Sequence, residues 1–151
     1  MFKYKKHITA FITAVSLSSG LASIVAPTSV AKAAPLSQLD QKLFDDAYSG
    51  AIDDVKDALS DGAKVNAKND LGSTPLHFAA LHGQKETAAL LISKGAKVNA
   101  KDQHGYTPLH SAIAWNDIKF FALLISNGAE MNATTDDSHT PLHKAAAYGK
   151  K

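Results

Sequence analysis

Apolar residues after residue 40 occur in short runs, and glycine or asparagine separates one run from the next. The clearest pair is PLHFAALH at 75–82 and KETAALLISK at 85–94. Leu76 points inward from the first run, and the alanines after it let a neighbouring helix come close. Gly83 and Gly95 follow the two runs, where a helix commonly ends at a residue with positive φ. The pattern predicts pairs of short helices joined by glycine turns.

The same four residues, Thr-Pro-Leu-His, stand at the start of each first helix, at 74–77, 107–110 and 140–143. Threonine is a good N-cap, because its hydroxyl can accept a hydrogen bond from an early helical amide. Proline suits the next position, where no amide hydrogen is needed and the fixed φ is already helical. The histidine can reach back toward the cap backbone, as in a capping box. The motif therefore predicts a helix start three times, at a constant interval along the chain.

The 33-residue period extends through the whole unit. Asn116 stands where the preceding unit has Gly83, and asparagine tolerates the left-handed conformation best after glycine. Ser138 stands where earlier units have Gly72 and Gly105, so we expect a strained or looser turn there. One such unit cannot bury its own apolar faces, whereas a stack of several can. The same period relates further loop positions: Gly62, Gly95, Gly128, Asn66, Asn99 and Asn132.

These units resemble the ankyrin repeat, whose signature is a G-x-TPLH-x-AA start, a glycine between the helices and an LL-x-x-GA-x-x-N end. The resemblance covers about residues 41–151 and implies an all-α repeat solenoid. Its units would be helix-turn-helix pairs with projecting β-turn or hairpin loops. In the first unit the TPLH position reads Gln41 to Phe44, as an atypical terminal repeat allows. The resemblance divides the domain into a degenerate first repeat at 41–68, full repeats at 69–101 and 102–134, and a truncated repeat at 135–151.

The last unit stops at YGKK, where its second helix should begin. Either Lys150 and Lys151 form the polar end of a natural half-repeat, or the reading frame continues in a longer protein. The sequence does not choose between these alternatives.

The segment 1–33 has the features of a signal peptide. MFKYKKH carries three lysines and no acid, and an apolar run follows from Ile8 to about Ala26. The AKA at 31–33 matches a signal-peptidase site, so we expect a mature chain that begins at Ala34, with a linker at 34–40. The alternative is an uncleaved anchor, because the run approaches the ~20 residues that a membrane span needs. We expect an exported protein, periplasmic or secreted.

The composition is that of a globular protein, with 45% apolar and 20% charged residues. The chain has no cysteine, which excludes disulfides, thiolate metal sites and a cysteine nucleophile. All 16 basic residues are lysines, and four of them lie in the segment 1–33, which leaves 12 lysines against 14 acids. The net charge of 34–151 is therefore near −2. We expect a monomer that binds neither nucleic acid nor, after signal cleavage, a membrane.

In ankyrin repeat proteins the turn tips and the exposed face of the first helix form a concave surface that binds other proteins. Tyr106, Trp115 and Tyr148 come from different repeats, and large aromatic side chains are enriched among interface hot spots. With Leu81 and His82 they form the predicted core of a partner-binding patch. The alternative for Trp115 is that its ring folds down and packs on the neighbouring helix. Carried over by position, the resemblance implies nine partner-binding residues: Tyr48, Leu71, Leu81, His82, His104, Tyr106, Trp115, His139 and Tyr148.

Some of the histidines also lie near acids. His104 and His139 lie on adjacent turn tips, beside Asp102, Asp136 and Asp137, and such residues can bind a metal. However, no two of them have the i, i+4 spacing of helical ligands, and turn tips are usually solvated. We expect no metal and no cofactor. The TPLH histidines are expected to be structural.

The sequence has no G-x-S-x-G, no H-E-x-x-H and no phosphate-cradling glycine loop, so we do not expect an enzyme. Two functions fit the pattern. The first is an exported protein–protein interaction module, similar to the exported ankyrin proteins of bacteria. The alternative is a structural or protective periplasmic factor that supports an envelope enzyme or assembly, anchored to the membrane if its leader is not cleaved.

Overall fold

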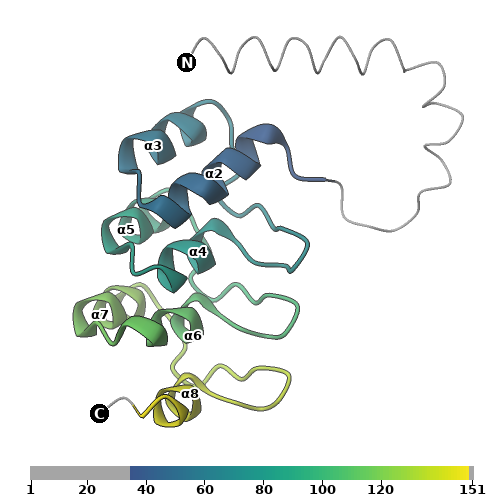
Figure 1. The fold of residues 1–151 in the computed structure, drawn as a ribbon. Coiled ribbons are helices and arrows are strands. Elements are labelled where there is room, and N and C mark those ends of the chain that lie inside the picture. The colour runs from purple at the N-terminus through teal and green to yellow at the C-terminus, as the bar shows by residue number, and fades with distance from the viewer. Residues whose placement is uncertain (1–34, 150–151) are drawn as a thin grey trace, which may run out of the picture. The chain divides into compact units, whose positions relative to one another are not determined.

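The computed structural model describes residues 35–149, and Figure 1 shows the helices that they form. The predicted signal peptide at 1–33, together with Lys150 and Lys151, lies outside the described residues. The described part contains helices and turns and no β-strand. Its elements are α2 (Gln38–Ser49), α3 (Ile52–Ser60), α4 (Pro75–Leu81), α5 (Lys85–Ser93), α6 (Pro108–Ala112), the 3₁₀ helix η2 (Ile113–Trp115), α7 (Ile118–Ser126) and α8 (Pro141–Ala147).

The helices stack in two columns, which confirms the predicted all-α repeat solenoid. Helices α2, α4, α6 and α8 form one column, and α3, α5 and α7 form the other (Figure 1). A loop projects from the stack before each of α4, α6 and α8. Each loop contains a tight turn; in the first, the backbone N–H of Gly72 donates to the carbonyl of Asn69 over 2.9 Å. The loops and the first helices of the pairs therefore share one side of the stack.

The TPLH motif forms the helix start that its sequence predicts. Thr74, Thr107 and Thr140 are N-caps, and a proline follows each of them in the first turn. In the first of these units the backbone N–H of Thr74 donates to Nδ1 of His77 over 3.1 Å. The equivalent bonds in the two later units are 3.2 Å long. Each start thus depends on residues within one turn of each other.

The core lies between the two columns and follows the period. Leu76 and Leu109 from the first helices, and Leu91 and Leu124 from the second helices, are at most 3% exposed. Burying a side chain of this size contributes ~1.5–3 kcal/mol. Leu142 has the same position in α8 but is 77% exposed, because no described second helix packs against it. Small residues between the leucines let the helices approach closely: Ala47, Ala58, Ala79, Ala80, Ala88 and Ala112.

The predicted linker at 34–40 is too long, because α2 already begins at Gln38. Ser37 is its N-cap, and the serine hydroxyl accepts the backbone N–H of Asp40 over 3.1 Å. Later units have a proline where the first unit has Lys42, and a proline there would exclude the helical hydrogen bonds of a preceding turn. Without it the helix extends one turn further toward the N-terminus.

Between Pro35 and Gly149, two residues other than glycine adopt the left-handed conformation at turns. Asn116 has φ 50° and Ser138 has φ 61°, as expected of residues in glycine positions. Gly72 and Gly105 meet a second requirement, because a Cβ on either would lie 3.0 Å from a backbone nitrogen of the next loop. No described loop follows the one that holds Ser138, so its side chain costs only the conformational strain of ~1–2 kcal/mol.

Hydrogen bonds of the repeated asparagines join each unit to the next. The side-chain amide of Asn66 donates to the carbonyl of Gly95 over 3.0 Å, and its oxygen accepts the backbone N–H of Lys97 over 2.8 Å. Asn99 makes both bonds again one unit later, over 2.8 and 2.9 Å. Asparagine recurs in the loops because one amide satisfies a donor and an acceptor of the following loop.

Candidate functional site

A groove of about 340 Å³ lies between the projecting loops and the first helices. Its volume is within the range of ligand-binding clefts. Apolar side chains form much of its wall, and Leu71, Leu81 and Tyr148 each keep about half of their surface exposed. Five of the nine predicted partner-binding residues line it: Leu71, Leu81, His104, Tyr106 and Tyr148.

Tyr106 lies inside the groove rather than at an open turn tip. The Nζ atom of Lys144 is 3.9 Å from the centroid of its ring, and His110 packs against it edge to face at 5.7 Å. A cation over an aromatic face contributes ~0.5–2 kcal/mol, with the larger value for a desolvated pair. Tyr106 is therefore only partly exposed, because Lys144 of α8 in the next unit covers one face of its ring.

Lys144 is the basic side chain of the groove. Burial lowers the pKa of Lys144, and the charge of Asp102 acts in the opposite direction. The carboxylate of Asp102 accepts the backbone N–H groups of His104 and Tyr106, both over 2.9 Å. That carboxylate therefore holds its own loop in shape. It does not form an ion pair with Lys144 within 4.0 Å.

His77 and His110 are buried behind the groove, and each holds the loop of the following unit. Because Nδ1 of His77 accepts the N–H of Thr74, the ring proton is on Nε2, which donates to the carbonyl of Tyr106 over 2.9 Å. His110 donates in the same way to the carbonyl of His139, over 3.3 Å. Burial lowers the pKa of both imidazoles and so favours their neutral form. These two TPLH histidines have the structural role that the sequence predicts.

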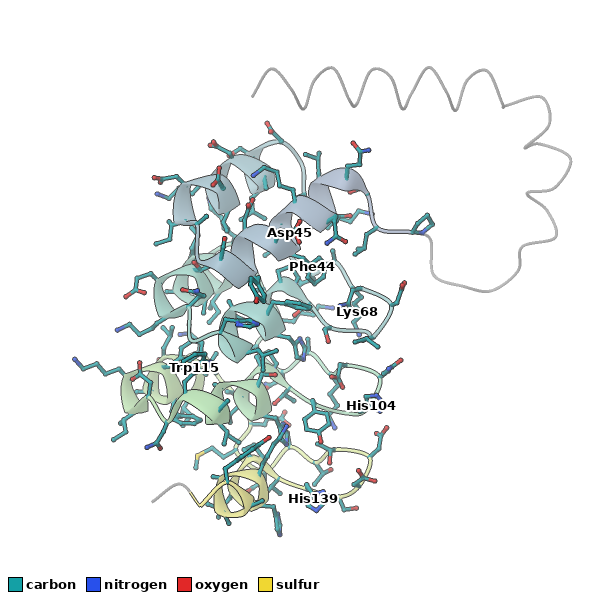
Figure 2. All side chains as sticks on the ribbon, in the orientation of Figure 1. Phe44, Asp45, Lys68, His104, Trp115 and His139 are labelled. Carbon is teal, nitrogen blue, oxygen red and sulfur yellow. The ribbon has the colours of Figure 1, made fainter. Side chains whose placement is uncertain are left out.

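Trp115 lies outside the groove, at the turn between α4 and α5 of the preceding unit (Figure 2). A Cβ on Gly83 would lie 3.2 Å from its ring, and its Nε1 donates to the carbonyl of Leu81. The ring therefore packs on the C-terminal end of α4 and on the turn after it, which agrees with the alternative that the ring packs on the neighbouring helix. Trp115 joins two repeats while 53% of its surface stays exposed.

Tyr48 and His82 also lie outside the groove, and their rings stack with centroids 3.9 Å apart. This stack and the contact of Trp115 both lie at the C-terminal end of α4. We call Tyr48, His82 and Trp115 the aromatic row. His139 does not line the groove either, although its loop does carry the bond to His110 (Figure 2). The predicted patch is thus divided between the groove and the aromatic row.

The described residues offer neither a metal site nor a membrane span. Between Pro35 and Gly149 no three or more histidine, aspartate, glutamate or cysteine side chains are placed to hold a metal ion. His104 instead pairs with the side chain of Gln103 over 3.1 Å. None of the helices in this range has the length and apolar character needed to cross a membrane.

Lys144, Phe78 and Asp102 line the groove, and the sequence singled out none of them for partner binding. The signal that could have found Lys144 is the residue directly after TPLH. That position reads Phe78, Ser111 and Lys144 in successive units, whereas the residues before it are constant. When one position varies while the residues before it stay constant, the fold does not require a particular side chain there. That side chain is free to serve binding.

Comparison with known proteins identifies one family. A family model described as "Ankyrin repeats (3 copies)" matches residues 43–135. No curated protein matches the sequence. Ankyrin repeats are generally protein–protein interaction modules and typically not enzymes. Because the matched segment spans more than half of the 151 residues, the chain belongs to the ankyrin repeat family.

Proposed function

We propose that this chain is an exported bacterial module that binds a partner protein in its groove. The observation that carries the proposal is the apolar wall of the groove, where Leu71, Leu81 and Tyr148 are each about half exposed. Monomeric soluble proteins rarely expose large contiguous apolar patches, and those that occur often mark interaction sites. Tyrosine supports the same function, because it adds a large contact area at a small loss of side-chain entropy.

The walls of the groove are held in place before any partner binds. The carbonyl of Leu71 accepts the backbone N–H of Gln103 over 3.0 Å, and the carbonyl of His104 accepts that of Asp136 over 3.0 Å. Neighbouring loops are therefore bonded tip to tip. Preformed walls favour binding, because less conformational entropy is lost when the complex forms.

The module acts by binding rather than by catalysis, and as a monomer. Both ring nitrogens of His77 and of His110 are used in structural hydrogen bonds, so neither imidazole has a nitrogen ready to exchange a proton with a substrate. The net charge near −2 of residues 34–151 supports a protein partner rather than a nucleic acid. The lysine-rich start, the apolar run and the AKA at 31–33 support export to the periplasm or the medium.

Photocrosslinking from the groove tests the proposed function. A photoreactive phenylalanine analogue replaces Tyr148 in the full-length chain, and a matched variant carries it at Ser93, an exposed residue at the end of α5 outside the groove. After irradiation of the cells that produce the chain, we expect one defined protein adduct from position 148 and none from position 93. Equal adducts from both positions, or adducts from position 93 alone, would contradict binding in the groove.

A further inference from the structure

Lys144 is a cation in a mostly apolar groove, and within residues 35–149 it forms no ion pair with a carboxylate at 4.0 Å or less. The ion pairs found between residues 35 and 149 involve Lys42, Lys56 and Lys85. Lys144 instead places its Nζ 3.9 Å from the centroid of the Tyr106 ring. A partly buried ammonium group keeps a desolvation penalty that a bound anion would offset, and the lowered pKa of Lys144 has this cause.

The groove itself does not supply that anion. Asp102 is the one acid that lines it, and its carboxylate already accepts two backbone N–H groups of its own loop. Both bonds use the same oxygen, Oδ1, and they hold the carboxylate where it forms no ion pair with Lys144 within 4.0 Å. A carboxylate on a partner is not tied to this loop and can approach Lys144 directly.

Apolar surface lies on more than one side of this cation. Tyr106 covers it from the loop, and Tyr148 follows one helical turn later at the end of α8. Leu71 and Leu81 continue the apolar wall toward the preceding unit. A ligand that places an acid at Lys144 therefore also meets apolar side chains in the same groove.

Resting on the proposed function, we propose that the groove recognises a segment of a partner protein in which one aspartate or glutamate is flanked by apolar side chains. The carboxylate of that residue bonds to Nζ of Lys144, and the flanking side chains pack on Leu71, Leu81 and Tyr148.

The acids near the groove exclude a polyanionic ligand. Asp136 and Asp137 are exposed on the loop directly before α8, and Asp70 is exposed on the loop before α4. A nucleic acid or an anionic membrane would bring many negative charges against these carboxylates, whereas a segment with one acid brings a single charge to Lys144. The arrangement therefore favours a protein segment with an isolated acid.

A displayed library of random 12-residue peptides provides the probe. The library is selected on the immobilised full chain, on Lys144→Gln, on Lys94→Gln as the control for loss of an exposed lysine outside the groove, and on Leu81→Asp, which disrupts the apolar wall. Circular dichroism melts establish that each variant is folded. We expect the wild-type chain and Lys94→Gln to enrich peptides with one acid between apolar residues, and Lys144→Gln to lose that preference for an acid.

A pair of synthetic peptides that differ only by glutamate or glutamine then measures the contact. For the wild-type chain the glutamine peptide should bind about tenfold more weakly, and this ratio should fall to about one for Lys144→Gln and for Lys144→Met, in which the hydrophobic part of the side chain is retained. Selected peptides that depend on Leu81 but show no preference for an acid would overturn this inference and leave the proposed function intact. Selection of no peptide that depends on Leu81 would overturn the proposed function as well.

Discussion

The imidazole of His77 donates from Nε2 to the backbone carbonyl of Tyr106, 29 residues later, over 2.9 Å. The same ring accepts the N–H of Thr74 at the start of its own helix. One side chain therefore sets a helix start in one repeat and the loop position of the next repeat, which carries the groove tyrosine. His110 makes the equivalent connection to the following loop.

Stability should fall on acidification because of these two histidines. In the folded chain burial lowers the pKa of His77 and His110 below 6.5, whereas in the unfolded chain both have the ordinary value. As the pH falls through 6.5 the unfolded state takes up protons first. The stabilisation is thus fully present above pH ~6.5 and is lost between that pH and the lowered pKa values, by at most ~1.4 kcal/mol per pH unit for each histidine.

Urea unfolding between pH 7.5 and pH 5 measures this loss. We expect the double substitution His77→Gln with His110→Gln to reduce the slope of the unfolding free energy against pH, since two proton-binding sites are removed. The control is His104→Gln, which removes an exposed imidazole whose side-chain bond is to Gln103, so that the loss of the two buried histidines can be compared with the loss of an exposed one. A wild-type chain whose stability does not change over this pH range would contradict the assigned tautomers and burial.

Two glycine substitutions should separate backbone strain from crowding. Gly95 has φ 94° and a Cβ there would meet nothing within 4 Å, so Gly95→Ala should cost only the conformational strain of ~1–2 kcal/mol. Gly72 has φ 73°, and its Cβ would lie 3.0 Å from the backbone nitrogen of Gln103. Gly72→Ala should therefore lower the free energy of unfolding more than Gly95→Ala does. If thermal or urea unfolding gave equal losses of unfolding free energy for the two variants, the neighbouring loop would have shifted to make room for the added Cβ without a further penalty.

Trp115→Ala should lower the free energy of unfolding, by ~1–3 kcal/mol, because it removes the ring from Gly83 and the hydrogen bond to Leu81. Trp115→Phe should recover part of the loss, since it keeps an aromatic ring without the N–H donor. The matched measurement is urea unfolding of all three chains. The contacts of Trp115 predict a role in stability, whereas the sequence alone predicts that this residue serves the partner-binding patch. An unchanged unfolding free energy for Trp115→Ala would restore that view.

Tyr148→Ala should show the opposite behaviour. Its side chain is 58% exposed and lies at the C-cap of α8, so its loss should change the unfolding free energy by no more than about 0.5 kcal/mol. In the groove it would remove a large contact, and affinity for the protein captured by crosslinking should fall at least about tenfold. Calorimetric titration of the purified partner measures this. An affinity equal to that of the wild-type chain would place the interface on another surface.

Export gives a prediction about the mature N-terminus. If the AKA at 31–33 is cleaved, N-terminal sequencing of the protein from its native host should begin at Ala34. Cell fractionation should then recover it from the periplasm or the medium. Recovery of the full-length chain from the cytosol alone would show that the proposed localisation is wrong.

The sequence by itself determined the TPLH helix starts, the glycine and asparagine turns between the helices and the period of the stack. Thr74, Pro75 and His77 act within one turn of backbone, and Gly83 and Asn116 take a conformation that their residue types favour. These interactions involve residues close together in the chain, so the local conformation can be predicted from a short stretch of sequence. Repetition of the same letters at a fixed interval then implies a stack, because one unit cannot bury its own leucines.

Only the tertiary structure decided where the binding residues lie relative to one another. Trp115 and Leu81 are 34 residues apart in sequence, and Lys144 and Tyr106 are 38 apart, yet each pair is in contact. Where such a side chain goes depends on the distance and angle between two repeats and on the residue that the neighbouring repeat presents. Both are properties of the packed stack. For this reason only the structure shows that Trp115 packs at the contact between two repeats and that Lys144 is the cation of the groove.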